Sequence, residues 1–242
     1  MGVTLGGMYA KSAAWYDLLH THKDYAGEAR AVAGVIREYH PRARSLLDVA
    51  CGTGAHLGFF RAEFDCFGVD IDDGLLEIAR ERFPDVGFTQ SCMTRYAIGR
   101  TFDAVTCLFS AIGYVQTNEN LDLAMANMAR HLNPGGVAVV EPWILPENWD
   151  AWVAKSKRYH VSESDGLTIA RVRATRRYGT MTELIMHYAA TDEHEITAVD
   201  EVHKVRMFTV EELIGAAGEA GLTAKWDPEG ITGRGLLIAI KQ

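Results

Sequence analysis

The chain has 242 residues, 48% of them hydrophobic, which favours one large domain with a sizeable core. Its formal net charge of -8 gives little support for a nucleic-acid partner, and no apolar run is long enough to span a bilayer. The four cysteines form no Cys-x-x-Cys pair, which argues against a zinc site or a disulfide framework. We therefore expect a protein of the reducing cytoplasm, without a metal site.

The first half of the chain alternates between helices and strands. Residues 1–40 have mainly helical character, and we interpret them as a lid over a ligand site, with residues 1–7 as a flexible leader at its start. The patterns that follow predict strands at 45–50, 66–71, 86–90, 102–109 and 136–141, and helices at 55–63, 72–83 and 119–132. Such alternation predicts a parallel sheet with helices on both faces.

The second half breaks this rhythm. Alternating apolar and polar residues predict antiparallel strands at 158–163, 167–178, 180–190 and 196–207. A capping box, Thr209-Val210-Glu211-Glu212, predicts a helix over 209–220, and strands follow at 223–228 and 236–240.

These elements predict one α/β domain over residues 1–242. Its core, residues 41–145 and 208–242, is a doubly wound, seven-stranded Rossmann-like sheet. Residues 146–207 form an inserted antiparallel sheet on the substrate side of that core.

The most informative segment is the strand and glycine turn from Leu47 to Gly54. Gly52 and Gly54 permit a tight turn, and the helix start behind them presents backbone N–H groups to a carboxylate or a phosphate. Asp70 ends the next strand, where a carboxylate can accept both ribose hydroxyls of a nucleoside. A turn needed only for packing is the alternative.

Dinucleotide enzymes share this logic, but their fingerprint needs a small residue where this chain has Leu57. The spacing therefore favours S-adenosylmethionine, with S-adenosylhomocysteine as the product. Asp48 and the backbone near Ala50 and Gly52 would then bind the amino-acid end, and Asp70 the ribose. Met93, which could instead be a simple core residue, would pack on adenine. The complete set of expected cofactor-binding residues is Tyr16, Tyr25, Asp48, Ala50, Gly52, Gly54, Asp70, Ile71, Cys92, Met93 and Leu108.

Three motifs resemble those of class I methyltransferases: Asp48 through Gly54, Gly68-Val69-Asp70, and Asn133-Pro134-Gly135-Gly136. The similarity extends to the nucleotide-sugar N-methyltransferases of antibiotic amino-sugar pathways. It is carried by Trp15-Tyr16-Asp17-Leu18, Lys23-Asp24-Tyr25, Phe109 through Tyr114, Val140-Glu141-Pro142-Trp143 and Gly233-Arg234-Gly235-Leu236. Cys92 departs from the family, which often has an acid there, so an adenine amino contact would pass to the backbone.

The resemblance implies methylation of the amino group of a dTDP-linked deoxyamino sugar. An aliphatic amine needs little help from a base, so we expect mainly proximity catalysis, with a weak general base or none. The candidate catalytic residues are Tyr16, Tyr114, His131 and Glu141. The two tyrosines could also be core aromatics, and His131 could merely complement a helix end.

We expect the substrate to contact Trp143, Arg234, Arg171, Arg173 and His203, with Arg234 suited to a bidentate grip on pyrophosphate. A solvated strand edge is the alternative for the strand arginines, and a satisfied or exposed strand residue is the alternative for His203. Two other functions remain open: O-methylation of a sugar or another small natural product, and a methyltransferase-like protein that only binds. The sequence leaves open the sugar, the carbon that bears the amine, one or two methyl transfers, and a monomer or a homodimer.

Overall fold

The computed structural model describes residues 12–242, so the expected leader and the first part of the expected lid lie outside the described residues. The described N-terminal segment contains a 3-10 helix, η1 (Ala13–Trp15), and two helices, α1 (Tyr16–Leu19) and α2 (Tyr25–Tyr39). Asp24 caps α2 by accepting a hydrogen bond from the N–H of Gly27. Among residues 12–242, no helix combines the length and the apolar character needed to cross a bilayer.

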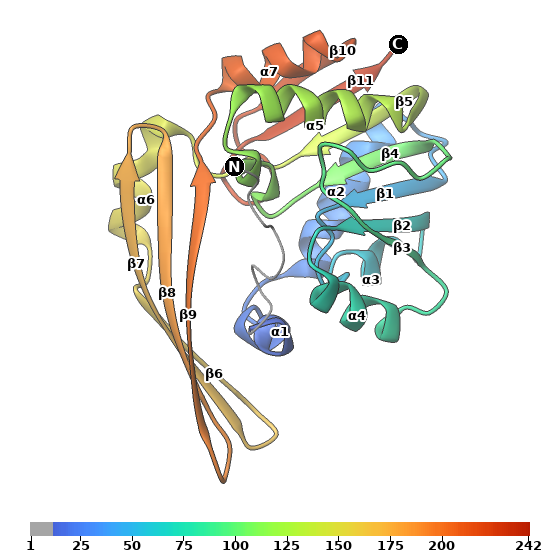
Figure 1. Cartoon of the computed structure of the whole chain (residues 1–242). Coiled ribbons are helices and arrows are strands. Elements are labelled where there is room, and N and C mark those ends of the chain that lie inside the picture. The colour runs from blue at the N-terminus through green and yellow to red at the C-terminus, as the bar shows by residue number, and fades with distance from the viewer. Residues whose placement is uncertain (1–11) are drawn as a thin grey trace.

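A seven-stranded sheet forms the core, as the sequence predicts (Figure 1). Its strands are β1 (Ser45–Val49), β2 (Asp65–Asp70), β3 (Gly87–Gln90), β4 (Phe102–Cys107), β5 (Leu132–Val140), β10 (Leu222–Asp227) and β11 (Leu236–Lys241). Their order is β10-β11-β5-β4-β1-β2-β3, and β11 runs antiparallel to both of its neighbours. The strands from β5 to β3 pair in parallel, so their carboxyl ends meet at one edge.

Helices cover both faces of this sheet (Figure 1). On one face, α5 (Asn118–Arg130) and α7 (Val210–Glu219) contribute buried residues to the larger apolar cluster. On the other, α2, α3 (Leu57–Phe60) and α4 (Asp73–Arg82) pack against the second cluster. The expected capping box at Thr209 and Glu212 is present at the start of α7.

A second sheet stands beside the core (Figure 1). It is antiparallel throughout, in the order β6 (Tyr159–Ser164), β7 (Leu167–Tyr178), β8 (Met181–Thr191) and β9 (Ile196–Arg206). It follows η3 (Pro146–Asn148) and α6 (Trp149–Lys155). Helix α1 lies between the two sheets, because Leu19 packs against Ile169 and Tyr188 of the second sheet.

Two local predictions need correction. The helix expected at 55–63 is α-helical only over Leu57–Phe60, and beyond it the chain continues with hydrogen bonds of the tighter 3-10 type, such as Glu63 N–H to Phe60 C=O. Strand β5 begins at Leu132 instead of residue 136, and a register shift against β4 between Phe102 and Ala104 accommodates the left-handed Gly135.

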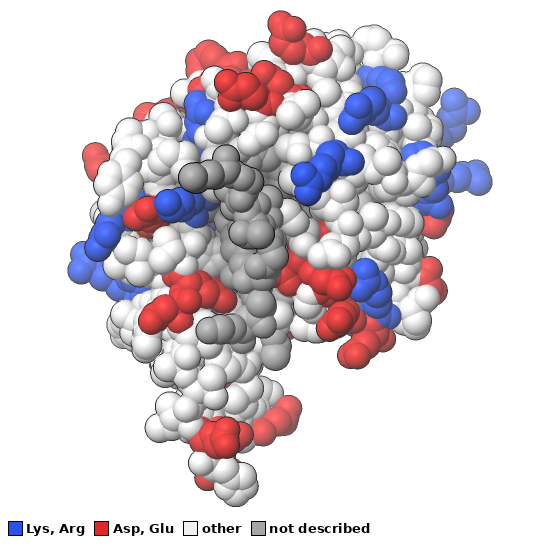
Figure 2. Space-filling view, viewed as in Figure 1, with Lys and Arg blue, Asp and Glu red and all other residues white. Residues whose placement is uncertain are grey.

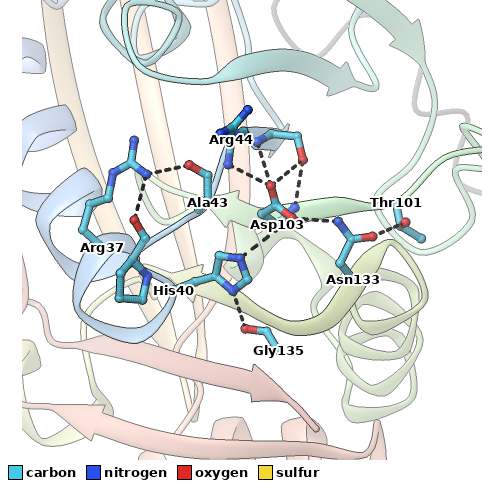
Figure 3. A network of polar contacts seen from close by, with 10 residues as sticks. Arg37, His40, Ala43, Arg44, Thr101, Asp103, Asn133 and Gly135 are labelled. Carbon is cyan, nitrogen blue, oxygen red and sulfur yellow. Dashed lines mark hydrogen bonds and ion pairs between the residues drawn. The ribbon is translucent and has the colours of Figure 1, made fainter.

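A polar network joins the chain at the amino ends of β1, β4 and β5, opposite the carboxyl edge (Figure 3). Asp103 accepts hydrogen bonds from the N–H groups of Arg44 and Ser45, the hydroxyl of Ser45 and the amide of Asn133. Burial opposes ionisation of this carboxyl, but these donors outweigh it and lower the pKa of Asp103 below its usual value. The ionised carboxylate thus ties the starts of three strands.

We expect Asp103→Ala to lower the free energy of unfolding by about 2–3 kcal/mol, since it leaves several strand-end donors without their charged acceptor. Urea unfolding at pH 7 measures this loss. The pKa of Asp103 is lower in the folded protein than in the unfolded chain. Its contribution to the free energy of unfolding is therefore complete above the pKa of the unfolded chain and disappears as the pH falls below about 4. Asp85→Ala, which removes an exposed ion pair with Arg61, is the control and should cost less than about 1 kcal/mol. Equal losses in the two variants would contradict the role of the network.

Candidate active site

The glycine turn after β1 holds three residues in the left-handed region. Ala50 has φ +61°, Gly52 +54° and Gly54 +75°, and a Cβ at Gly54 would lie only 3.0 Å from the ring of Phe83. The N–H of Gly52 donates to Asp70 Oδ2 at 2.7 Å, which joins the turn to the end of β2. The turn is therefore a fixed loop at the carboxyl edge of the sheet.

Two buried carboxylates stand beside this loop. Asp48 accepts a hydrogen bond from the hydroxyl of Thr106 at 2.8 Å, and burial raises the pKa of Asp48 to about 6. Burial also raises the pKa of Asp70, which accepts the N–H groups of Gly52 and Asp72. Desolvated carboxylates of this kind gain from a bound cation or from bound hydroxyl donors, and they mark a candidate ligand site.

Helix α1 is fastened over the loop by Asp17. One oxygen of Asp17 accepts the hydroxyl of Thr53 at 2.6 Å, and the other pairs with Arg82 of α4. These contacts bring Tyr16 and Tyr25 to a small hollow beside the glycine turn. The hollow is lined by Tyr16, Tyr25, Asp48, Ala50, Cys51, Gly52, Thr53, Ala55, His56, Leu108 and Phe109.

The hydroxyl of Tyr25 is buried and has no hydrogen-bond partner among residues 12–242. A buried polar atom without a partner is costly and rare, and at a functional site it indicates a group that a ligand satisfies. Six of the eleven expected cofactor-binding residues line this hollow. A seventh, Asp70, accepts a hydrogen bond from the glycine turn that borders it. The hollow is therefore suited to the polar end of a small ligand.

Gly54 belongs to the glycine turn itself, and the other three expected residues lie along the same edge. Ile71 follows β2, and its carbonyl accepts the side-chain amide of Gln90 at the end of β3. Cys92 and Met93 come just after β3, where the Cys92 thiol contacts the Thr94 hydroxyl and Met93 packs against the core cluster. These contacts suit an apolar wall for the adenine ring. They include no acidic side chain for the adenine amino group.

Sequence reasoning did not identify a buried ionic cluster beside the hollow. Glu28 of α2 pairs with Lys23 and lies 2.8 Å from Nε2 of His56. The ammonium of Lys23 also stands 4.3 Å from the ring centroid of Phe109. No periodic pattern links these positions, although two of them belong to segments shared with the resembling family.

A second loop, after β4, is also held by a carboxylate. Phe109 and Ser110 are left-handed, with φ +52° and +67°, and the N–H of Phe109 donates to Glu141 Oε2 at 2.7 Å. The other oxygen of Glu141 accepts the hydroxyl of Thr232. Because both oxygens are engaged inside the protein, the contacts of Glu141 favour holding this loop over transferring a proton.

Aromatic and cationic groups continue from this loop toward the second sheet. Arg234 donates to Ser110 Oγ at 2.8 Å, and its guanidinium stands 5.4 Å from the ring centroid of Trp143. The indole Nε1 of Trp143 is buried without a hydrogen-bond partner in the structure. Trp143 packs edge-on against Trp152, and Arg173 covers the Trp152 ring from β7.

The inward face of the second sheet carries the other expected substrate residues. Arg171 pairs with Tyr188 across the strands and lies near His20 and His22 of the N-terminal segment. His203 is fully buried, and its Nδ1 lies 3.0 Å from the hydroxyl of Tyr114. The arrangement leaves Arg171, Arg173 and His203 on the side of the sheet that faces the core.

His131 requires a correction. It caps the C-terminus of α5, and its carbonyl accepts the N–H of Phe102 at the start of β4, at the amino edge of the sheet. Its ring contacts the carbonyl of Asn127, the N–H of Ile98 and the ring of Tyr96. The structure therefore places His131 away from the site, and the helix-end alternative describes its contacts.

For Glu141 we expect opposite results from two substitutions. Glu141→Gln retains an oxygen for the Phe109 N–H and a donor for Thr232, so kcat should stay within about tenfold of wild type. Glu141→Ala leaves the left-handed loop without its acceptor, and we expect a loss of about 2–4 kcal/mol in the free energy of unfolding together with weaker cofactor binding. Steady-state kinetics and thermal unfolding check both. A hundredfold or larger drop in kcat for Glu141→Gln with unchanged stability would instead identify Glu141 as a general base.

Comparisons with known proteins agree with this geometry. A family model described as a methyltransferase domain matches residues 46–136. The chain is 41% identical, over 93% of its length and 95% of the relative's, to a dTDP-3-amino-3,4,6-trideoxy-alpha-D-glucopyranose N,N-dimethyltransferase of Streptomyces venezuelae. The crystal structure of Streptomyces venezuelae DesVI aligns with a TM-score of 0.87 at 38% identity, covering 96% of this chain and 99% of that one. The S-adenosylmethionine-bound structure of CalS10, an amino pentose methyltransferase from Micromonospora echinaspora, aligns with a TM-score of 0.81 at 36% identity, covering 96% of each chain. The chain therefore belongs to the family of S-adenosylmethionine-dependent methyltransferases that contains these sugar N-methyltransferases.

Proposed function

We propose that this enzyme transfers methyl groups from S-adenosylmethionine to the amino group of a dTDP-linked deoxyamino sugar. The observation that carries the proposal is the near full-length similarity to an N,N-dimethyltransferase of such a sugar. The site described above adds independent support, because it combines a nucleoside-type loop with a neighbouring cluster of aromatic and cationic side chains, Arg234, Trp143, Trp152 and Arg173. We extend to this chain the two successive methyl transfers that the relative's name states.

The residues around the glycine turn fit the cofactor. In our proposal Asp48 lies beside the cofactor's ammonium group, the loop N–H groups face its carboxylate, and Asp70 accepts the ribose hydroxyls. The unpartnered Tyr25 hydroxyl gives the polar end of the cofactor a further hydrogen bond. Ile71, Cys92, Met93 and Leu108 would border the adenosine. When bound, the cofactor supplies a methyl group that is already strongly electrophilic.

The substrate would occupy the side toward the second sheet. Arg234 would grip the pyrophosphate, helped by its stacking on Trp143, and the unpartnered Trp143 Nε1 would donate to the sugar nucleotide. Arg171 and Arg173 would add positive charge from β7. The face of the molecule in Figure 2 shows acidic and basic groups interspersed. In this proposal the positive charge that attracts the anionic substrate comes from these few arginines.

Catalysis would depend mainly on proximity. Tyr16 lines the hollow beside the glycine turn, and Tyr114 follows the loop that Glu141 holds. In this proposal the two hydroxyls orient the acceptor nitrogen in line with the methyl group and keep water out of the path. The four unpaired cysteines suit the reducing cytoplasm, where we place the reaction.

The proposal is tested by incubating the protein with methyl-labelled S-adenosylmethionine and a panel of dTDP-amino sugars, with the matching hydroxy sugars as controls. We expect label on amines and not on hydroxyls, and mass spectrometry to show products carrying one and two added methyl groups. Transfer to hydroxyls alone would support the alternative O-methyltransferase, and cofactor binding without any transfer would support the alternative binding protein.

Two substitutions should separate the two halves of the site. We expect Asp70→Ala to weaken cofactor binding at least tenfold, because the ribose hydroxyls lose a charged acceptor worth about 1.5–3 kcal/mol. We expect Arg234→Ala to weaken binding of the sugar nucleotide and leave cofactor affinity nearly unchanged. Calorimetry with each ligand measures both effects, with the exposed Asp73→Ala and Arg176→Ala as matched controls. Loss of both affinities in Arg234→Ala would mean that its contact with Ser110 is structural.

A further inference from the structure

A chain of hydrogen-bonding side chains runs from η2 into the second sheet. The hydroxyl of Tyr114, in η2 (Ala111–Val115), lies 3.0 Å from Nδ1 of His203 on β9. Nε2 of His203 lies 3.2 Å from Glu201 Oε2, and Ser12 donates its hydroxyl to Glu201 Oε1 at 2.6 Å. His203 has no exposed surface, whereas Tyr114 is partly exposed.

The proposal assigns an ionised Glu201 and a neutral His203 before the reaction. An ionised Glu201 can only accept, so Nε2 of His203 then carries the hydrogen between them. The neutral ring then presents Nδ1 as an acceptor, and the hydroxyl of Tyr114 must be the donor. In this arrangement Tyr114 can pass its proton inward to His203, and Glu201 stabilises the imidazolium that results.

The outer end of this chain stands at the proposed reaction centre. Tyr114 follows the left-handed loop that Glu141 holds, and it packs with Trp143, Leu184 and Val205 on the substrate side. Phe109, at the start of the same loop, lines the cofactor hollow together with Asp48, which brings the loop that carries Tyr114 to the cofactor side as well. Tyr114 is thus the point at which a proton could enter the buried pair.

We propose that Tyr114, His203 and Glu201 form a proton relay that accepts the proton released by the acceptor amine. The inference rests on the proposed N-methylation. At neutral pH an aliphatic amine with a pKa of about 8 is mostly an ammonium ion, so it must lose one proton before its nitrogen attacks each methyl group. Tyr114 is the group that touches the substrate, and His203 and Glu201 act through it as positioning residues.

The proton balance is complete within the reaction. The ammonium gives its proton to the oxygen of Tyr114 as the hydroxyl proton of Tyr114 moves to Nδ1 of His203. The freed nitrogen lone pair forms the N–C bond, the S–C bond of the sulfonium breaks, and its electron pair stays on sulfur. After the product leaves, the imidazolium returns the proton through Tyr114 to water.

Other titratable groups face the relay and must be considered in any pH study. Tyr188 of β8 lies beside Glu201, and burial raises the pKa of Tyr188 well above its usual value, with a further contribution from Glu201. Arg171 of β7 pairs with Tyr188 across the strands, and Tyr16 of α1 lines the neighbouring hollow. The raised pKa values of Tyr16 and Tyr188 keep both phenols neutral across the working range.

The second sheet also supplies a matched control. His187 and Asp200 pair at 2.7 Å across β8 and β9, but their side chains are 54% and 81% exposed. Asp200→Asn therefore removes a carboxylate from a His–acid pair of the same two strands without touching the relay. Glu201→Gln is the corresponding relay variant, since an amide oxygen can still accept from His203 but cannot stabilise an imidazolium.

The experiment measures kcat for the first and second methyl transfers from pH 6.5 to 9.5 in wild type, Glu201→Gln, Tyr114→Phe and Asp200→Asn. We expect Glu201→Gln and Tyr114→Phe to lower kcat by roughly 10-fold to 100-fold at pH 7. This loss is at or below the smallest rate effects typical of a positioned general base. At pH 9.5 the free amine is abundant, so both variants should return to within about threefold of wild type. Asp200→Asn should follow wild type throughout.

Three further readings separate a relay from a structural role. The double variant should be no slower than the slower single variant, because both act on one proton path. At pH 7 both single variants should release more monomethyl product than wild type. Imidazole nitrogen NMR of labelled protein should show His203 with hydrogen on Nε2. Cofactor affinity, measured by calorimetry, should be unchanged in both variants.

A loss of kcat that is equal at every pH, or no loss in either variant, would overturn the relay. If Glu201→Gln does not fold, Tyr114→Phe alone carries the same test. Absence of transfer by wild-type protein to any amine would instead refute the proposed function, so the two failures can be told apart.

Discussion

A buried carboxylate that accepts the N–H of a left-handed loop residue fixes each of the two loops that form the site. Asp70 holds Gly52 after β1, and Glu141 holds Phe109 after β4. Left-handed backbone at Phe109 and Ser110 is unfavourable for residues with a Cβ, and it persists only where surrounding contacts determine it. The parallel sheet supplies those contacts, because adjacent strands end at one edge and bring each acid to its loop. The rigidity of the site therefore comes from the sheet beneath it.

The sequence was most informative where a local rule decides the structure. Alternating strands and helices predicted the seven-stranded sheet, and the turn around Gly52 with Asp70 marked the carboxyl edge. The Thr209–Glu212 capping box also follows from a local pattern. The short α3 and the early start of β5 could not be predicted in this way, because 3-10 hydrogen bonds and a register shift depend on packing against neighbouring elements.

The site itself was less predictable. Residues within the recognisable motifs, such as Asp48 and Tyr25, lie together in the structure, whereas the partners that hold them come from distant segments. Thr232 contacts Glu141 and Ser110 contacts Arg234 across long stretches of chain, and no local pattern in the sequence predicts these pairings. His131 shows the reverse case: a functional residue type near a conspicuous turn proved to cap a helix at the opposite edge.

The contacts of Asp17 affect how small molecules can enter and leave the hollow beneath α1. A single carboxylate joins α1 both to Thr53 in the glycine turn and to Arg82 on α4, while Leu19 of the same helix is embedded in the second sheet. Any movement that lifts α1 from the hollow must break a charged contact at one end and expose apolar surface at the other. Opening is thus opposed by an ion pair, which salt weakens, and by apolar burial, which salt does not weaken. The entry and exit of small molecules beneath α1 would therefore respond to ionic strength only in part.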